Sequence, residues 1–175
     1  MNDFNKIKLL ILDNDGVLTD SRIIYDNNHL ESKNFSAKDG LGIRLLQHTD
    51  IQLAVITGRA SKILEKRCQD LDIKLLFQKV RNKSKKAEEL LKELNLEWEN
   101  VAYLGDDWND YPVVKRCGIS AAPADAFPDF KEKVDVVLSR EGGKGVVREF
   151  IELILKEQGI FIETLEKLIS YLETL

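Results

Sequence analysis

The sequence predicts an α/β fold in which a parallel sheet is covered by helices on both of its faces. Short apolar runs of strand length alternate along the chain with stretches of helical period. The runs are apolar throughout, which is typical of parallel strands that are buried on both sides. Each run and the helical stretch after it are therefore expected to form a βα unit. The expected strands are residues 7–12, 52–56, 74–77, 101–104, a short piece near Ile119, and 134–138.

Helical periodicity fills most of the intervals between these strands. In the stretch 84–94, for example, the apolar residues fall on one face. Near the C-terminus, the glycine-rich segment 142–145 precedes another helical stretch, and Gly159 separates that stretch from an amphipathic tail. The expected helices are residues 41–48, 61–71, 84–94 and 146–157, with a C-terminal tail helix at about 160–174.

One segment, at about residues 21–35, departs from this alternation. Two short runs of β-forming residues, 22–25 and 29–35, flank the turn sequence Asp26-Asn27-Asn28. This pattern predicts a β-hairpin in the place where the first βα unit would have its helix.

Composition limits the classes of protein to which the chain can belong. Its 175 residues, 43% of them hydrophobic, suffice for one domain with a sizeable core, so a single domain over residues 1–175 is expected. The formal net charge is −4 and no basic run dominates, so we expect no nucleic acid partner. The apolar run near the N-terminus is too short for a signal-peptide core or a membrane span. We therefore expect a cytoplasmic protein without a membrane partner.

Polar residues follow the ends of four predicted strands. Asp13 and Asp15 come directly after the first strand, and Thr57 and Arg59 come after the second. Lys83 follows the third strand and its loop, and the acidic segment 106–110 follows the fourth. Because ligands of open α/β sheets bind at the carboxyl ends of the strands, we expect these groups to converge on one rim.

Several of these groups are acids, and their proximity has an electrostatic cost. Two carboxylates about 4 Å apart repel by about 4 kcal/mol at an effective dielectric near 20, so Asp13, Asp15 and Asp106 need a cation to hold them together. Oxygen ligands without histidine or cysteine favour Mg²⁺ over softer metals. Acids at the starts of loops also serve as turn formers and helix caps, and this alternative stays open for Asp107 and Asp110.

Four segments together resemble, in order, the motifs of the haloacid dehalogenase superfamily of phosphatases. They are Asp13-Asn14-Asp15-Gly16-Val17-Leu18-Thr19, Thr57-Gly58-Arg59, Lys83, and Gly105-Asp106-Asp107 followed by Asp110. The resemblance covers about residues 6–158. It implies a Rossmann-like parallel sheet, a hairpin in place of a cap domain, and Mg²⁺ as cofactor.

The resemblance also assigns roles to individual residues. Asp13 would be the nucleophile that carries an aspartyl-phosphate, and Asp15 would be the general acid and base. The carboxylates of Asp13 and Asp106 and the backbone carbonyl of Asp15 would bind the metal. Thr57 and Lys83 would hold the phosphoryl oxygens.

Other positions are implied less directly. Asp107 and Asp110 would support the metal ligands without binding the metal themselves. Asn14 occupies a position that is usually apolar in the phosphatase subgroup that this chain resembles more narrowly.

A narrower resemblance connects the chain with the 3-deoxy-D-manno-octulosonate 8-phosphate phosphatases. It is carried by the hairpin and by the segments 35–44, 65–68 and 142–149. It implies hydrolysis of a small-molecule sugar acid phosphate in lipopolysaccharide precursor synthesis, by a homotetramer with its hairpins meeting at the centre.

The sugar acid carries a carboxylate, which guanidinium groups bind in a bidentate manner. Arg44, Arg59 and Arg67 are the candidates, and their alternative is a set of solvated helix arginines. The segment 36–40 would lie at the entrance and present backbone donors. The substrate-binding residues predicted in this way are Ser36, Ala37, Lys38, Asp39, Gly40, Arg44, Arg59, Arg67 and Lys83.

Two other functions remain as alternatives. A nine-carbon sugar acid of the sialic type would need the same chemistry, but phosphatases of that kind tend to carry an acid where this chain has Arg59. A receiver domain of a signalling switch also gathers acids, a threonine and a lysine at strand ends. A receiver, however, accepts phosphate on a residue of its third strand, whereas Asp13 and Asp15 follow the first.

Overall fold

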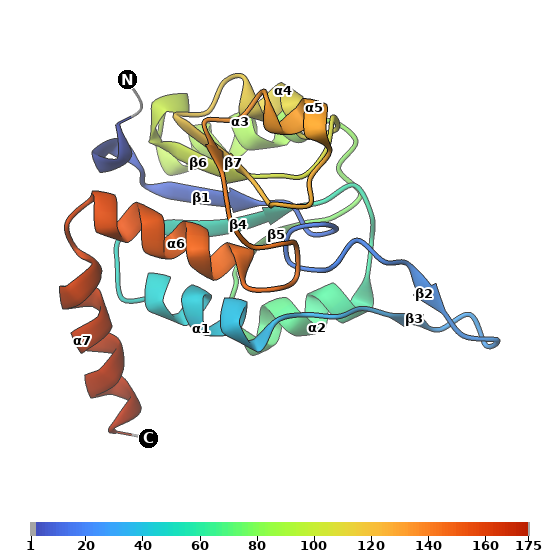
Figure 1. Ribbon diagram of the computed structural model, residues 1–175, viewed down its shortest axis with the longest axis horizontal. Helices are drawn as coiled ribbons and strands as arrows, with labels where there is room; N and C mark the ends of the chain where they lie inside the picture. Colours follow the sequence, from blue (N-terminus) through green and yellow to red (C-terminus); the bar gives the residue numbers. More distant parts are fainter. Residues whose placement is uncertain (1–2, 175) are drawn as a thin grey trace.

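The order of the strands in the central sheet distinguishes the predicted phosphatase fold from the fold of a receiver domain. The computed structural model describes residues 3–174, and its sheet has six parallel strands in the order β5-β4-β1-β6-β7-β8 (Figure 1). When the strands of this sheet alone are numbered along the chain, without β2 and β3 of the separate hairpin, this is the doubly wound order 3-2-1-4-5-6. Receivers have the order 2-1-3-4-5. The predicted α/β class is confirmed, and the receiver alternative is wrong. The strands are β1 (Leu9–Leu12), β4 (Gln52–Ile56), β5 (Leu75–Phe77), β6 (Val101–Leu104), β7 (Ile119–Ala122) and β8 (Val136–Val137).

Helices cover both faces of this sheet (Figure 1). Along β1 the buried side chains alternate between the two layers: Leu10 and Leu12 belong to the core cluster under α1, α2 and α6, and Leu9 and Ile11 to the cluster under α3, α4 and α5. The helices are α1 (Ala37–Leu46), α2 (Lys62–Asp70), α3 (Lys83–Leu94), α4 (Tyr111–Val114), α5 (Pro128–Lys131), α6 (Val146–Glu157) and α7 (Phe161–Leu172), with short 3₁₀ turns at Phe4–Lys6 and Trp98–Asn100.

The start of α1 differs from the sequence prediction by four residues. The side chain of Ser36 caps this helix, because its Oγ accepts hydrogen bonds from the N–H groups of Lys38 (3.2 Å) and Asp39 (3.3 Å). The cap precedes the apolar periodicity from which the helix was predicted. The four-residue helices α4 and α5 were not predicted, because one turn is too short to show a period.

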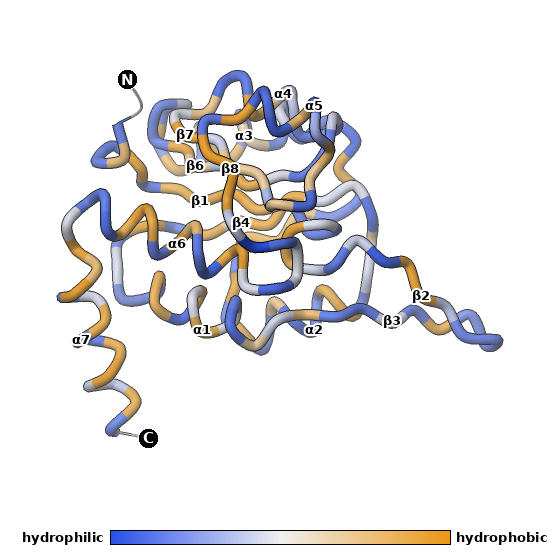
Figure 2. Tube along the Cα trace, in the orientation of Figure 1, coloured by the Kyte–Doolittle hydropathy of each residue, from blue (hydrophilic) through white to orange (hydrophobic). Residues whose placement is uncertain are grey.

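The predicted hairpin is present and projects away from the sheet (Figure 1). It consists of the antiparallel strands β2 (Ile24–Tyr25) and β3 (Glu31–Ser32). The carboxylate of Asp26 fixes its tip by accepting hydrogen bonds from the N–H groups of Asn28 (2.9 Å) and Leu30 (2.8 Å). Apolar residues are exposed along it. Figure 2 shows apolar colouring at β2.

The tail helix is also present, as α7. It packs against α1 through a face that includes the buried residues Thr164 and Leu168. Over residues 3–174, no helix has both the length and the apolar character that crossing a bilayer requires.

Candidate active site

Acidic residues gather where β1 and β6 end. Asp13 follows β1 and Asp106 follows β6, and the two strands are paired in parallel with Leu12 opposite Leu104. Carboxylate oxygens of Asp13, Asp106 and Asp110 all lie within 4.8 Å of one another. The pairing of the strands therefore accounts for the proximity of Asp13 and Asp106.

A buried lysine lies within this acidic cluster. Lys83, the first residue of α3, places its Nζ 2.8 Å from Oδ1 of Asp13 and 2.6 Å from Oδ1 of Asp110. Asp110 also accepts hydrogen bonds from the hydroxyl of Tyr103 (2.5 Å) and from the N–H of Asp106 (3.0 Å). Both oxygens of Asp110 thus accept hydrogen bonds, and the contact of Oδ1 with Nζ fixes Lys83 beside Asp13.

The structure also tests whether Asp107 and Asp110 act as turn formers or helix caps. Asp110 occupies the position before α4, but its side chain makes no capping hydrogen bond, so that interpretation is wrong for Asp110. Oδ1 of Asp107 accepts the N–H of its neighbour Trp108 at 2.7 Å, so this carboxylate is bonded within its own loop.

The charges of the cluster do not balance. Burial raises the pKa of Asp13 to about 7; the charge of Asp110 adds to this rise and Lys83 opposes it. Burial, together with the charges of Asp13 and Asp110, raises the pKa of Asp106 to about 8. Burial disfavours the charged form of Lys83, but the two neighbouring acids outweigh it and raise the lysine pKa. One lysine faces three carboxyl groups, so a hard cation such as Mg²⁺ fits this all-oxygen donor set.

Two glycines make room for these carboxylates. Gly16 has a φ of +87°, and a Cβ at this position would lie 1.9 Å from Oδ2 of Asp106. A Cβ on Gly105 would lie 2.4 Å from Oδ2 of Asp110. A larger residue at either position would displace an acid of the cluster.

A cavity of about 340 Å³ opens over the acidic cluster. Trp108 lines its rim with 46% of its surface exposed, and neither Trp108 nor Ser21 nor Asn109 was assigned to the site from the sequence. Larger cavities of about 660 and 640 Å³ lie beside α6 and α7 and contain none of the three clustered acids. The lining residues are Asp13, Asp15, Ser21, Thr57, Gly58, Arg59, Asp106, Asp107, Trp108 and Asn109.

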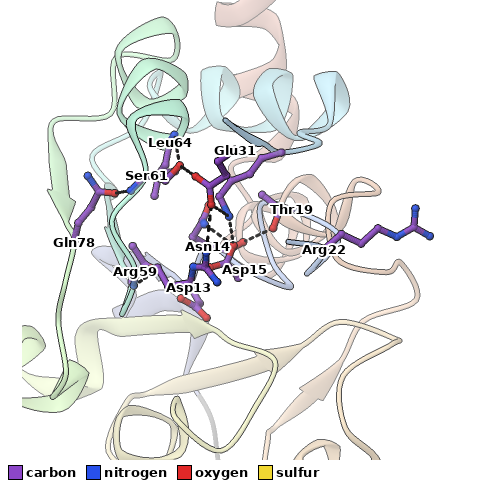
Figure 3. A network of polar contacts seen from close by, with 12 residues as sticks. Asp13, Asn14, Asp15, Thr19, Arg22, Glu31, Arg59, Ser61, Leu64 and Gln78 are labelled. Atoms are coloured by element: carbon purple, nitrogen blue, oxygen red, sulfur yellow. Dashed lines mark hydrogen bonds and ion pairs between the residues drawn. The ribbon is translucent and has the colours of Figure 1, made fainter. Parts of the chain in front are cut away.

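The hairpin contacts the site through Asp15, as Figure 3 shows for part of this network. Oδ1 of Asp15 accepts hydrogen bonds from Nζ of Lys33 (2.6 Å) and from Nδ2 of Asn14 (3.0 Å). The Arg59 guanidinium places Nε 4.0 Å from Oδ2 of Asp15 and Nη2 3.4 Å from Oε1 of Glu31. Sequence reasoning missed Lys33 and Glu31, because no local pattern indicates which hairpin residues return to the sheet.

Comparisons with known proteins agree with this geometry. A family profile described as haloacid dehalogenase-like hydrolase matches residues 73–150. The 3-deoxy-D-manno-octulosonate 8-phosphate phosphatase of Escherichia coli (strain K12) is 47% identical over 153 residues, which are 87% of this chain and 81% of that protein. The chain belongs to this phosphatase family.

Solved structures of the phosphatase family have the same fold. The Moraxella catarrhalis enzyme, described as a complex with magnesium, phosphate and KDO, aligns with a TM-score of 0.91 at 35% identity, covering 94% of this chain and 95% of that one. The cobalt-bound Haemophilus influenzae enzyme aligns with a TM-score of 0.87 at 45% identity, covering 91% and 93%.

The residues that the sequence predicts to bind the sugar acid do not all lie at the cavity. Arg59 lines the cavity, but Nη2 of Arg67 donates instead to the backbone carbonyl of Ser36 at 3.0 Å. The carboxylate of Asp39 is buried and accepts the N–H groups of Gly145 (3.1 Å) and Arg148 (3.0 Å), which ties α1 to the start of α6.

The remaining predicted substrate residues lie near α1 or beneath the acids. Ala37, Lys38 and Arg44 are exposed on α1, and Gly40 is buried. Lys83 lies beside Asp13. Within residues 3–174, Arg59 is the one predicted substrate residue that lines the cavity.

Proposed function

We propose that this chain is a Mg²⁺-dependent phosphatase of the cytoplasm, which hydrolyses 3-deoxy-D-manno-octulosonate 8-phosphate in lipopolysaccharide precursor synthesis. The observation that carries the proposal is the buried contact between Asp13 and Lys83, 2.8 Å long, beside Asp106 where β1 and β6 end. Relatives that are 45–47% identical over most of the chain bear the name of this activity.

Asp13 and Asp15 perform the covalent chemistry in two steps. In the first step, a carboxylate oxygen of Asp13 attacks phosphorus and forms an aspartyl-phosphate, while the bond between phosphorus and the sugar oxygen breaks. Asp15 gives its proton to the leaving sugar oxygen. In the second step, water attacks the same phosphorus and gives a proton to Asp15, which releases phosphate and regenerates Asp13.

Lys83 and Thr57 hold the transferring phosphoryl group. The Lys83 ammonium lies beside Asp13, where negative charge accumulates on the phosphoryl oxygens, and Asp110 keeps it there. Thr57 follows β4 and lines the same cavity. Because these groups are fixed before substrate binds, they need little reorganisation during the reaction.

The carboxylates of Asp13 and Asp106 and the backbone carbonyl of Asp15 would hold Mg²⁺. When bound, the ion supplies positive charge to phosphoryl oxygens that Lys83 does not reach. The excess of carboxylates over lysines in the cluster supports this assignment.

Arg59 is the main candidate for binding the sugar carboxylate, because it lines the cavity that contains Asp13. The segment 36–40, Arg44 and Arg67 remain predicted contacts. Their placement near α1 makes them candidates for the outer part of the substrate.

A panel of sugar phosphates, assayed with and without Mg²⁺, tests the proposed function. The eight-carbon sugar acid phosphate is expected to give the highest kcat/KM, and chelation of the metal is expected to abolish turnover. A higher kcat/KM for a nine-carbon sialic-type phosphate would overturn the substrate assignment and leave the mechanism in place.

Replacing Arg59 with alanine is expected to raise KM for the sugar acid phosphate. A charge-assisted hydrogen bond contributes about 1.5–3 kcal/mol, so kcat/KM should fall roughly 10- to 150-fold. Hydrolysis of a small phosphate ester without a carboxylate should change little. The matched control is Arg116→Ala, which removes an arginine bonded to Glu88 on α3. Equal losses on both substrates would contradict a role of Arg59 in binding the carboxylate.

We expect a homotetramer whose hairpins meet at its centre. The hairpin exposes apolar side chains that a lone chain leaves in water, among them Tyr25 at 58% and Leu30 at 65%. Light scattering at micromolar concentration should give the mass of four 20.0 kDa chains. Leu30→Asp should dissociate the assembly, whereas Ile162→Asp on the exposed face of α7 should not. A monomeric wild-type protein would contradict this expectation.

A further inference from the structure

Two donors that lie outside the cavity hold the carboxyl group of Asp15. They are Nδ2 of Asn14 and Nζ of Lys33, and both bond to the same oxygen, Oδ1. Asp15 lines the cavity, but Asn14 and Lys33 do not. Two donors use both acceptor lone pairs of Oδ1, so Oδ2 is the oxygen left for partners in the cavity.

The amide of Asn14 carries a cost in stability. Asn14 is 1% exposed, and its own Oδ1 has no hydrogen-bond partner within residues 3–174. Turning the amide over would not help, because its oxygen would then face a carboxylate oxygen of Asp15. An apolar side chain would avoid the unpaired acceptor altogether. What the amide supplies, and an apolar side chain cannot, is the donor to Asp15.

The ammonium group of Lys33 is held by a second carboxylate, that of Glu31 in the hairpin. The Lys33 side chain is 0% exposed, and its Nζ also lies 3.5 Å from Oε1 of Glu31. Glu31 in turn accepts the hydroxyl hydrogen bond of Ser61 at 2.6 Å, and Figure 3 shows Glu31, Ser61 and Asp15 gathered in one network. The ammonium is therefore fixed between two carboxylates of different elements.

We propose that Asn14 and Lys33 are positioning residues that fix Oδ1 of Asp15 and leave Oδ2 to exchange a proton with the leaving group and with water. This inference rests on the proposed function, because it concerns the acid and base role of Asp15. The physical basis is that a general acid works only when its proton is aimed at the leaving oxygen, so a loosened carboxyl group loses rate rather than substrate affinity.

The test compares two leaving groups in the variants Asn14→Val and Lys33→Met. The rate of leaving-group release is measured in the first turnover, by rapid quenching. One substrate is the sugar phosphate that the wild-type protein hydrolyses fastest, whose alkoxide needs a proton to leave. The other is p-nitrophenyl phosphate, whose phenolate leaves without one.

For the sugar phosphate, release is expected to slow roughly tenfold in Asn14→Val and roughly 100-fold in Lys33→Met, with KM unchanged. For the aryl phosphate, both variants should stay within about threefold of wild type, because the step no longer depends on Asp15 as acid. Lys33→Arg keeps a donor and should recover part of the loss.

Two controls separate positioning from folding. Asn14→Val removes the unpaired acceptor, so it should melt at the wild-type temperature or above while its sugar phosphate rate falls. Lys167→Met makes the same change as Lys33→Met at an exposed ion pair with Glu163 on α7, 2.7 Å long, and should leave both rates unchanged.

Equal losses on the two substrates would overturn the positioning role of Asn14 and Lys33. Absence of any Mg²⁺-dependent turnover by the wild-type protein would instead overturn the proposed function itself.

Discussion

Asp13→Asn is expected to lower kcat by roughly four orders of magnitude or more, because the amide has nearly the same shape but no nucleophilic oxygen. No neighbouring acid can replace it. Both oxygens of Asp110 are occupied by Lys83, Tyr103 and the N–H of Asp106, so Asp110 is not free to attack phosphorus.

The measurement is steady-state hydrolysis of the preferred sugar phosphate, together with circular dichroism to confirm that the variant folds. Asp129→Asn, on the exposed side of α5, is the matched control and should retain full activity. Activity of Asp13→Asn within about tenfold of wild type would rule out Asp13 as the nucleophile.

Asp110→Ala is expected to lower the free energy of unfolding by about 3 kcal/mol, because it leaves buried donors without their acceptor. The hydroxyl of Tyr103 and the N–H of Asp106 would lose their partner, and Lys83 would keep only Asp13. The activity should fall as well, since the lysine would no longer be held from two sides.

Urea unfolding, followed by circular dichroism, measures this change. Tyr103→Phe removes one donor to Asp110 and leaves the charge of Asp110 in place, so it should lower the free energy of unfolding by only about 1 kcal/mol. Asp129→Ala provides the exposed control. A loss below about 1 kcal/mol for Asp110→Ala would show that the buried network around Lys83 contributes little to stability.

Local sequence determined where the strands end, and this in turn placed the acids. The run before Asp13 and the run before Asp106 were both recognisable as buried parallel strands. Carboxyl ends of neighbouring parallel strands share one edge of a sheet, so the two acids had to approach each other once β1 paired with β6.

For other residues, the local sequence does not indicate which partner the side chain binds. Asp110 precedes a helical turn, as a cap does, but only the packed core shows that its carboxylate turns inward to Lys83 and Tyr103. Asp39 lies in the segment 36–40, which is predicted to present backbone donors at the substrate entrance, and no local signal indicates that its carboxylate accepts N–H groups at the start of α6, more than a hundred residues away. Pattern reasoning cannot distinguish such cases, because the partner is distant in sequence.

The sequence by itself determined the α/β class, the hairpin after β1 and the set of chemical groups that follow the strands, because each depends on periodicity and turn residues within a short window. The tertiary structure alone decided that Nζ of Lys33 bonds to Oδ1 of Asp15, and that the oxygen of Asn14 has no hydrogen-bond partner within residues 3–174 while its Nδ2 donates to Asp15. The contact between Lys33 and Asp15 depends on how the hairpin leaves the sheet. That direction is set by the packing of the whole chain and is not encoded in any one segment.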